Sequence, residues 1–90
     1  MKSEKSITLR IINALGLHAR SAAKLARLAG EAQRGVWITK NGNTADASSL
    51  LDILTLDCPE GSEITITIDS EADRDVLVRI DALIRSGFGE

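Results

Sequence analysis

The chain has 90 residues, 43% of them hydrophobic and 27% charged, and a formal net charge of −2. These values are ordinary for a soluble globular protein and exclude a disordered chain, so we expect a single domain over residues 1–90. The small negative charge argues against a nucleic-acid partner, and no apolar run reaches the roughly 18 residues of a membrane span.

Aromatic residues and cysteine are both scarce. Trp37 and Phe88 are the two aromatic residues, too few for the stacking platform of a single-strand RNA-binding sheet. Cys58 is the sole cysteine, so no internal disulfide can form, and a cytoplasmic location is expected. We interpret Cys58 as a small apolar filler near a helix end.

The first half of the chain predicts a strand, a helix and a hairpin. Apolar residues alternate over residues 7–11, which is typical of a strand with one buried face, and a loop follows over residues 13–16. From Ala19 the apolar spacing becomes helical until Gly30. Residues 36–40 read as a strand, Asn41-Gly42 as a hairpin turn, and residues 43–46 as its second arm.

The second half predicts a short helix, a strand and a final helix. Ser48 or Ser49 can cap the short helix, which ends before Pro59. Alternation over residues 64–68 predicts the clearest strand. Ser70, followed three positions later by Asp73, resembles a helix-start signature, and an apolar stripe then continues to about Gly87.

Each predicted helix has one apolar stripe and each predicted strand one apolar face. The simplest way to bury them is an α+β open-faced β-sandwich: a four-stranded, mostly antiparallel sheet with three helices on one face, in the order βαββαβα.

The only histidine, His18, lies where the first helix should begin. The first N–H groups of a helix lack internal partners and carry partial positive charge, so this position suits an anion. A neutral imidazole is nucleophilic, and Arg20 stands two positions on. His18 could therefore accept a phosphoryl group. The simpler interpretation, an N-cap or surface histidine, would be favoured for an arbitrary lone histidine.

Gly16-Leu17-His18-Ala19-Arg20, on the loop after the first strand, resembles the motif of HPr, the histidine-containing phosphocarrier of the bacterial phosphoenolpyruvate-dependent phosphotransferase system. The resemblance extends from about Ile7 to Gly89 and includes Asn41-Gly42, the serine-started short helix and the C-terminal helix. Ser86-Gly87-Phe88, together with residues 13–16 and 54–57, is most similar to the nitrogen-related branch of the family.

The resemblance implies a phosphoryl relay. Enzyme I would transfer a phosphoryl group to Nδ1 of His18, and a downstream acceptor protein, in sugar transport or regulation, would take it. Arg20 would stabilise the phosphate together with the backbone of Ala19 and Arg20. The protein would be a carrier and not an enzyme, with no cofactor and no metal.

The family normally has proline where this chain has Ser21. Serine gives up a preorganised φ, worth about 0.4–1 kcal/mol, and adds a hydroxyl near the site. We expect phosphoryl transfer to continue. Ser49 aligns with a serine that HPr kinase/phosphorylase modifies in some bacteria, although a helix cap is the preferred interpretation.

The resemblance also implies a docking surface around His18 for weak contacts with acidic partners. Leu50 and Leu51 are better candidates for it than Ile53, and a monomer is expected. The predicted partner-binding residues are Leu17, Lys24, Arg27, Leu50, Leu51 and Leu54.

Three other functions compete with this interpretation. An HPr-like regulatory protein could act by contact without histidine phosphotransfer, but such relatives lack the histidine that this chain has. A ferredoxin-like ligand- or RNA-binding module would leave residues 16–20 unexplained. An independent enzyme would need a general acid or metal ligands, for which the sequence shows no pattern.

Overall fold

A computed structural model describes residues 5–90, so residues 1–4 of the predicted domain lie outside the described residues. The helices and strands follow one another in the predicted order. In chain order they are β1 (Ser6–Arg10), α1 (Ala19–Ala29), β2 (Val36–Lys40), β3 (Asn43–Asp46), α2 (Leu50–Thr55), β4 (Glu63–Ile68) and α3 (Arg74–Arg85), with 3₁₀ turns η1 (Glu71–Asp73) and η2 (Gly87–Gly89) on either side of α3.

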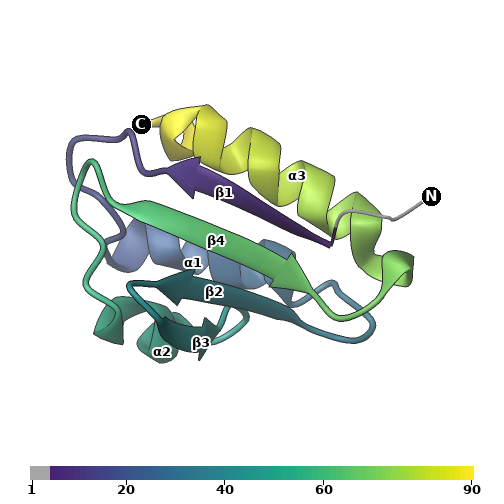
Figure 1. The fold of residues 1–90 in the computed structure, drawn as a ribbon. Coiled ribbons are helices and arrows are strands. Elements are labelled where there is room, and N and C mark those ends of the chain that lie inside the picture. The colour runs from purple at the N-terminus through teal and green to yellow at the C-terminus, as the bar shows by residue number, and fades with distance from the viewer. Residues whose placement is uncertain (1–4) are drawn as a thin grey trace.

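The strands form one sheet in the order β1-β4-β2-β3, and every pairing is antiparallel. The central strand β4 pairs with β1 in the register Ile7↔Ile66 and with β2 in the register Ile38↔Ile66. The helices cover one face of this sheet, with α3 beside β1 and α1 behind β4 and β2 (Figure 1). This confirms the predicted open-faced β-sandwich.

The core lies between the sheet and the helices, because the apolar sides of both face inward. Ile64, Ile66 and Ile68 of β4 are almost fully buried, which is the face predicted by their alternation. Leu25 of α1 and Ile80 of α3 pack into the same cluster. No helix within residues 5–90 has the length and the apolar character needed to cross a membrane.

The hairpin turn lies at the predicted residues. The first helix also ends at the predicted glycine, but the backbone conformation of this glycine differs from the usual one. Asn41 and Gly42 both have positive φ, 50° and 82°, as a tight hairpin turn requires. Gly30 caps α1, but with φ −65° it is right-handed, so any residue could adopt this backbone conformation. The helix end is instead closed by two backbone hydrogen bonds: Gly30 N donates to the carbonyl of Ala26 at 2.9 Å, and Glu31 N donates to the carbonyl of Leu28 at 3.1 Å.

Asp73 has a different role from the one its spacing predicted. Ser70 does cap η1, since its Oγ accepts a hydrogen bond from Ala72 N at 3.1 Å. Asp73 makes no side-chain cap for α3 and is buried. Its carboxylate accepts from the backbone N–H groups of Gln33 (2.7 Å) and Arg34 (2.8 Å), so it ties the loop before β2 to the start of α3.

We predict that Asp73→Asn lowers the free energy of unfolding at neutral pH, because asparagine brings an N–H group against backbone donors. Hydrogen bonds from Gln33 and Arg34 hold the pKa of Asp73 below its ordinary value. The ionised carboxylate therefore stabilises the fold above the pKa of the unfolded chain, and this contribution is lost as the pH falls through the folded value. In urea titrations from pH 7 downward, the difference in the free energy of unfolding between the wild type and the variant should disappear at acid pH.

The matched control is Asp75→Asn, which removes an exposed carboxylate two residues further on, in the first turn of α3. It should change the free energy of unfolding little. If the loss of unfolding free energy in Asp73→Asn stayed constant with pH, the ionised carboxylate of Asp73 would not have the stabilising role given to it.

Candidate functional site

His18 is the N-cap of α1, at the helix start where the sequence placed it, and its side chain is 26% exposed. The loop before it is fixed against the segment that follows α2. Leu17 N donates to the carbonyl of Cys58 at 2.8 Å. Gly16 has φ +66°, and a Cβ there would lie 2.5 Å from the same carbonyl oxygen and 2.7 Å from Pro59 Cα. Only glycine permits this approach, which places His18 at the helix start.

Ser21 fixes the backbone before α1 by hydrogen bonds, at the position where the resembling family has a proline. Its side chain is fully buried, and Oγ accepts a hydrogen bond from His18 N at 3.0 Å. The same hydroxyl donates to the carbonyl of Gly16, also at 3.0 Å. Ser21 therefore clamps the backbone on both sides of Leu17, and the loss of preorganisation expected from its replacing proline is offset by two hydrogen bonds.

The two nitrogens of the His18 ring have different partners. Nδ1 accepts from Arg20 N, a first-turn N–H group, at 3.3 Å. Nε2 lies 2.7 Å from Glu90 Oε2. Because Nδ1 faces a donor and Nε2 faces a carboxylate, the neutral ring carries its hydrogen on Nε2 and its free electron pair on Nδ1.

Glu90 is held in place by Asn13 and Arg20. Its other carboxylate oxygen, Oε1, accepts from Asn13 Nδ2 at 3.0 Å, and Arg20 NH2 lies 3.6 Å from Oε2. The pKa of the Glu90 carboxyl is below its ordinary value, mainly because of the Asn13 hydrogen bond and further because of His18 and Arg20, while partial burial opposes the shift. Glu90 is therefore an anion at neutral pH.

The predicted phosphate-binding residues lie together at the start of α1. The Arg20 side chain is exposed, and the backbone of Ala19 and Arg20 forms the first turn. The prediction that Leu17 faces a partner is wrong: its side chain is 7% exposed and belongs to the core, because the strict loop geometry turns it inward.

The other predicted partner-binding residues lie on α1 and α2. Arg27 is exposed, whereas Lys24 is half-buried and donates from Nζ to the carbonyl of Phe88 at 2.6 Å. Leu51 is exposed, and Leu50 and Leu54 are half-buried.

Ser49 is the N-cap of α2, with Oγ accepting from Asp52 N at 3.3 Å, so it has the expected capping role. Its phosphorylation by a kinase stays a prediction. Cys58 is buried after α2, as expected, and this burial raises the pKa of its thiol.

Sequence reasoning missed the roles of Asn13 and Glu90. No local pattern links two residues 77 positions apart, and an acidic residue in a tail is ordinarily solvated. The available signal was Ser86-Gly87-Phe88, the segment that resembles the nitrogen-related branch; in the structure this segment precedes Glu90, which contacts His18. Within residues 5–90, no group of three or more His, Cys, Asp or Glu residues could hold a metal ion.

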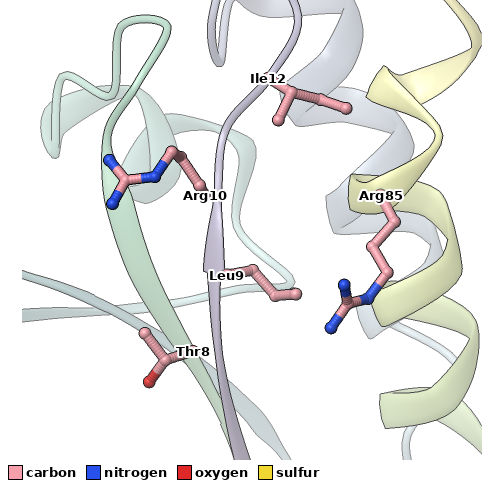
Figure 2. A pocket seen from close by; sticks show the side chains of 5 residues that line it. All are labelled: Thr8, Leu9, Arg10, Ile12 and Arg85. Carbon is pink, nitrogen blue, oxygen red and sulfur yellow. The ribbon is translucent and has the colours of Figure 1, made fainter.

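A surface hollow lies apart from this site, between β1 and α3. It is lined by Thr8, Leu9, Arg10, Ile12 and Arg85. Figure 2 shows Leu9 and Arg85 reaching into the space between the strand and the helix. Both arginines already have partners: Arg10 donates to the carbonyl of Gly61 at 2.7 Å, and Arg85 to Asp81 at 2.6 Å. The hollow therefore offers no unpaired cation for an anionic ligand.

Comparison with known proteins decides which family has this arrangement. Residues 5–86 match the family described as PTS HPr component phosphorylation site. The chain belongs to the HPr family. The phosphocarrier protein HPr of Cupriavidus necator is 40% identical over 80 residues, covering 89% of this chain and 90% of that protein. The phosphocarrier protein NPr of Escherichia coli K12 is 34% identical, covering 92% of this chain and 93% of that protein, so NPr proteins are among the relatives.

Solved HPr structures share the whole fold. HPr-C-His from Thermoanaerobacter tengcongensis superposes with a TM-score of 0.91 at 29% identity, covering 97% of this chain and 98% of that one. HPr from Bacillus anthracis superposes with a TM-score of 0.81 at 29% identity, covering 88% and 94%. The open-faced sandwich with three helices is thus the HPr fold.

We predict that Ser21→Ala lowers the free energy of unfolding by about 1–2 kcal/mol, because the His18 N–H loses its partner and the Gly16 carbonyl loses one of its two donors, keeping Asn13 alone. Urea unfolding followed by circular dichroism measures the change. Ser6→Ala, on the exposed side of β1, is the matched control and should stay within about 0.5 kcal/mol of the wild type. Equal stability of the two variants would show that the clamp contributes nothing.

Proposed function

We propose that this HPr-family chain accepts a phosphoryl group from phosphorylated Enzyme I on Nδ1 of His18 and passes it to a downstream acceptor protein. One observation carries the proposal: the free electron pair of Nδ1 faces the first-turn N–H of α1, at the end of a helix that favours negative charge. The ring thus supplies the nucleophile and then carries the negatively charged phosphoryl group.

The Nδ1 electron pair is easily released for attack. Its hydrogen bond from Arg20 N is 3.3 Å long, longer than usual for an N–H donor. When Nδ1 bonds to phosphorus, the same N–H lies beside a phosphoryl oxygen, and the other first-turn N–H groups add further donors. The donor's bond to phosphorus breaks, and the chain's own part consists of positioning and charge stabilisation.

Arg20 supplies the positive charge for the transferred group. Its guanidinium is exposed and rests 3.6 Å from Glu90, a loose ion pair that costs little to give up. A phosphoryl group on Nδ1 carries about two negative charges and offers several acceptor oxygens, so it competes well with one carboxylate for the guanidinium.

We predict that His18→Ala abolishes phosphorylation when the protein is incubated with phosphoenolpyruvate and Enzyme I. The wild type should acquire one phosphate that is stable in alkali and labile in acid. Mass spectrometry of the intact protein measures this. Arg20→Ala should slow phosphate uptake roughly tenfold, the scale of one charge-assisted contact.

Arg79→Ala is the matched control, since Arg79 is an exposed arginine of α3 paired with Glu31. It should take up phosphate at the wild-type rate. Phosphate that persists in His18→Ala would overturn the proposal. A wild type that binds Enzyme I but takes up no phosphate would favour the alternative, a regulatory protein that acts by contact alone.

We further propose that the exposed apolar surface of α2 and the basic side of α1 dock these partners. Leu51 is 73% exposed, which is unusual for a large hydrophobic residue and favours a protein contact. Arg27 lies on α1, which packs against α2, so a basic edge accompanies the apolar patch. This combination suits brief contacts with acidic partners.

We predict that Leu51→Asp raises the KM for phosphorylated Enzyme I roughly tenfold while leaving the stability of the carrier unchanged, because an exposed apolar contact is replaced by a charge. Steady-state transfer kinetics measure the KM. Val78→Asp is the matched control: Val78 is 58% exposed but lies on α3. Equal effects of the two substitutions would remove α2 from the docking surface.

We propose that the carrier works as a monomer. Residues of a single chain contact both the backbone N–H and the two ring nitrogens of His18, so the proposed chemistry needs no residue from a second copy. Dimers are reported among the solved structures that resemble this chain, including HPr from Thermoanaerobacter tengcongensis and Crh from Bacillus subtilis. Sedimentation at several concentrations distinguishes the two states.

A further inference from the structure

The face of the sheet that the helices leave open carries one aromatic residue, Trp37. Its neighbours in β2, Val36 and Ile38, are buried in the core, so Trp37 points away from the helices (Figure 1). The residue is 36% exposed. Along the chain Trp37 follows the C-terminal end of α1, whereas His18 precedes its N-terminal end. This surface is therefore separate from the site of His18 and from the docking surface on α1 and α2.

The indole ring of Trp37 is held in one orientation. Its Nε1–H donates to Oδ2 of Asp69 at 3.0 Å. Asp69 N in turn donates to the carbonyl of Gly35 at 3.3 Å. A Cβ at position 35 would lie 3.0 Å from Asp69 Oδ2 and 3.7 Å from Trp37 Nε1, so the carboxylate and the edge of the indole meet in the space that glycine leaves. Because the N–H is occupied, the ring offers a ligand its π face.

Two carboxylates flank this ring. Asp69 follows β4 on one side of β2, and Asp46 lies directly opposite Trp37 on β3, where cross-strand neighbours have Cβ atoms about 5 Å apart. Hydrogen bonds from the hydroxyl of Ser48 (2.6 Å) and from its N–H (2.8 Å) both go to Oδ1 of Asp46 and hold the pKa of that carboxyl below its ordinary value. No ion pair within residues 5–90 includes Asp46 or Asp69. The ring thus lies between two carboxylates that have no cation.

The neighbouring part of the open face is uncharged. Thr8, Thr65, Thr39 and Thr44 form one row across the four strands. Their hydroxyls bond in pairs, Thr8 to Thr65 at 3.0 Å and Thr39 to Thr44 at 2.8 Å. This row supplies a level surface beside Trp37 without a positive charge, so the two carboxylates determine which charge the ring attracts.

We propose that the open face binds a protein partner through an arginine side chain that stacks on Trp37 and pairs with Asp46 and Asp69. A guanidinium is planar and cationic, so it is attracted to the face of an indole while its N–H groups donate to carboxylates. A sugar ring also stacks on tryptophan but would leave both carboxylates without a cation, and they would repel the phosphates of a nucleic acid. The partner on this face is basic, in contrast to the acidic partners of the α1 and α2 surface, and it leaves His18 accessible.

The test uses a capped tri-arginine peptide, titrated into the ¹⁵N-labelled full chain and followed by NMR. The chain has one tryptophan, so a single indole N–H signal reports on the site. This signal should shift together with the amides of Asp46 and Thr67, the two residues opposite Trp37. A capped tri-glutamine peptide should cause no shift. A tri-lysine peptide should bind more weakly, because an ammonium is a point charge that cannot stack as a guanidinium does.

The variants separate the ring from the two charges. Asp69→Asn removes a charge but keeps an acceptor oxygen for the indole N–H, and both it and Asp46→Asn should weaken tri-arginine binding roughly two- to fivefold, the scale of one exposed contact to a cation. Trp37→Val keeps a residue suited to a strand and should abolish the shifts at Asp46 and Thr67. Asp75→Asn, which removes an exposed carboxylate of α3, is the matched control and should bind like the wild type.

Three results would overturn the proposal. Equal weakening by Asp75→Asn, or shifts spread over the whole surface, would show only a general attraction between a cationic peptide and an acidic chain. Equal affinity for tri-lysine would remove the preference for arginine. An indole signal that moves with maltose but not with tri-arginine would make Trp37 a surface for sugars. None of these measurements involves phosphorylation, so their outcome does not depend on the proposed function of His18.

Discussion

The hydrogen bond from Leu17 N to the Cys58 carbonyl determines where α1 begins, and the rest of the site depends on it. It joins the loop after β1 to the segment after α2, and the two segments approach so closely that only glycine fits at position 16. With this point fixed, His18 becomes the first residue of the helix start, and the Ser21 hydroxyl can reach both neighbouring backbone groups. The chemistry of the ring then follows from ordinary helix-end electrostatics.

The fold was predictable because its signals are local. Alternation in residues 64–68, the Asn41-Gly42 turn and the helical spacing after Ala19 each predict one element, and each is confirmed. One-sided burial then leaves few arrangements open to a chain of this size. Asp73 was misassigned because its partners, Gln33 and Arg34, are far away in the sequence, and a spacing rule considers only near neighbours.

The site was predictable only in part, for the same reason. His18 and Arg20 stand in a short motif, so their position at a helix start followed from the chain itself. Asn13 and Glu90 meet through the η2 turn, whose left-handed Phe88 no propensity would favour. Leu17 was misjudged because the docking surface was expected to surround His18, whereas the side chain of Leu17 is buried in the core.

Contributions to the site come from the beginning, the middle and the end of the described chain: Asn13 to Ser21, Cys58 and Phe88 to Glu90. Loops closed over such separations form late and open early, because each closure costs chain entropy that only the finished core repays. A partly folded chain would carry the histidine without its surroundings. The His18 ring thus acquires its hydrogen-bond partners only in the fully folded chain. The ability to accept a phosphoryl group therefore indicates that folding is complete.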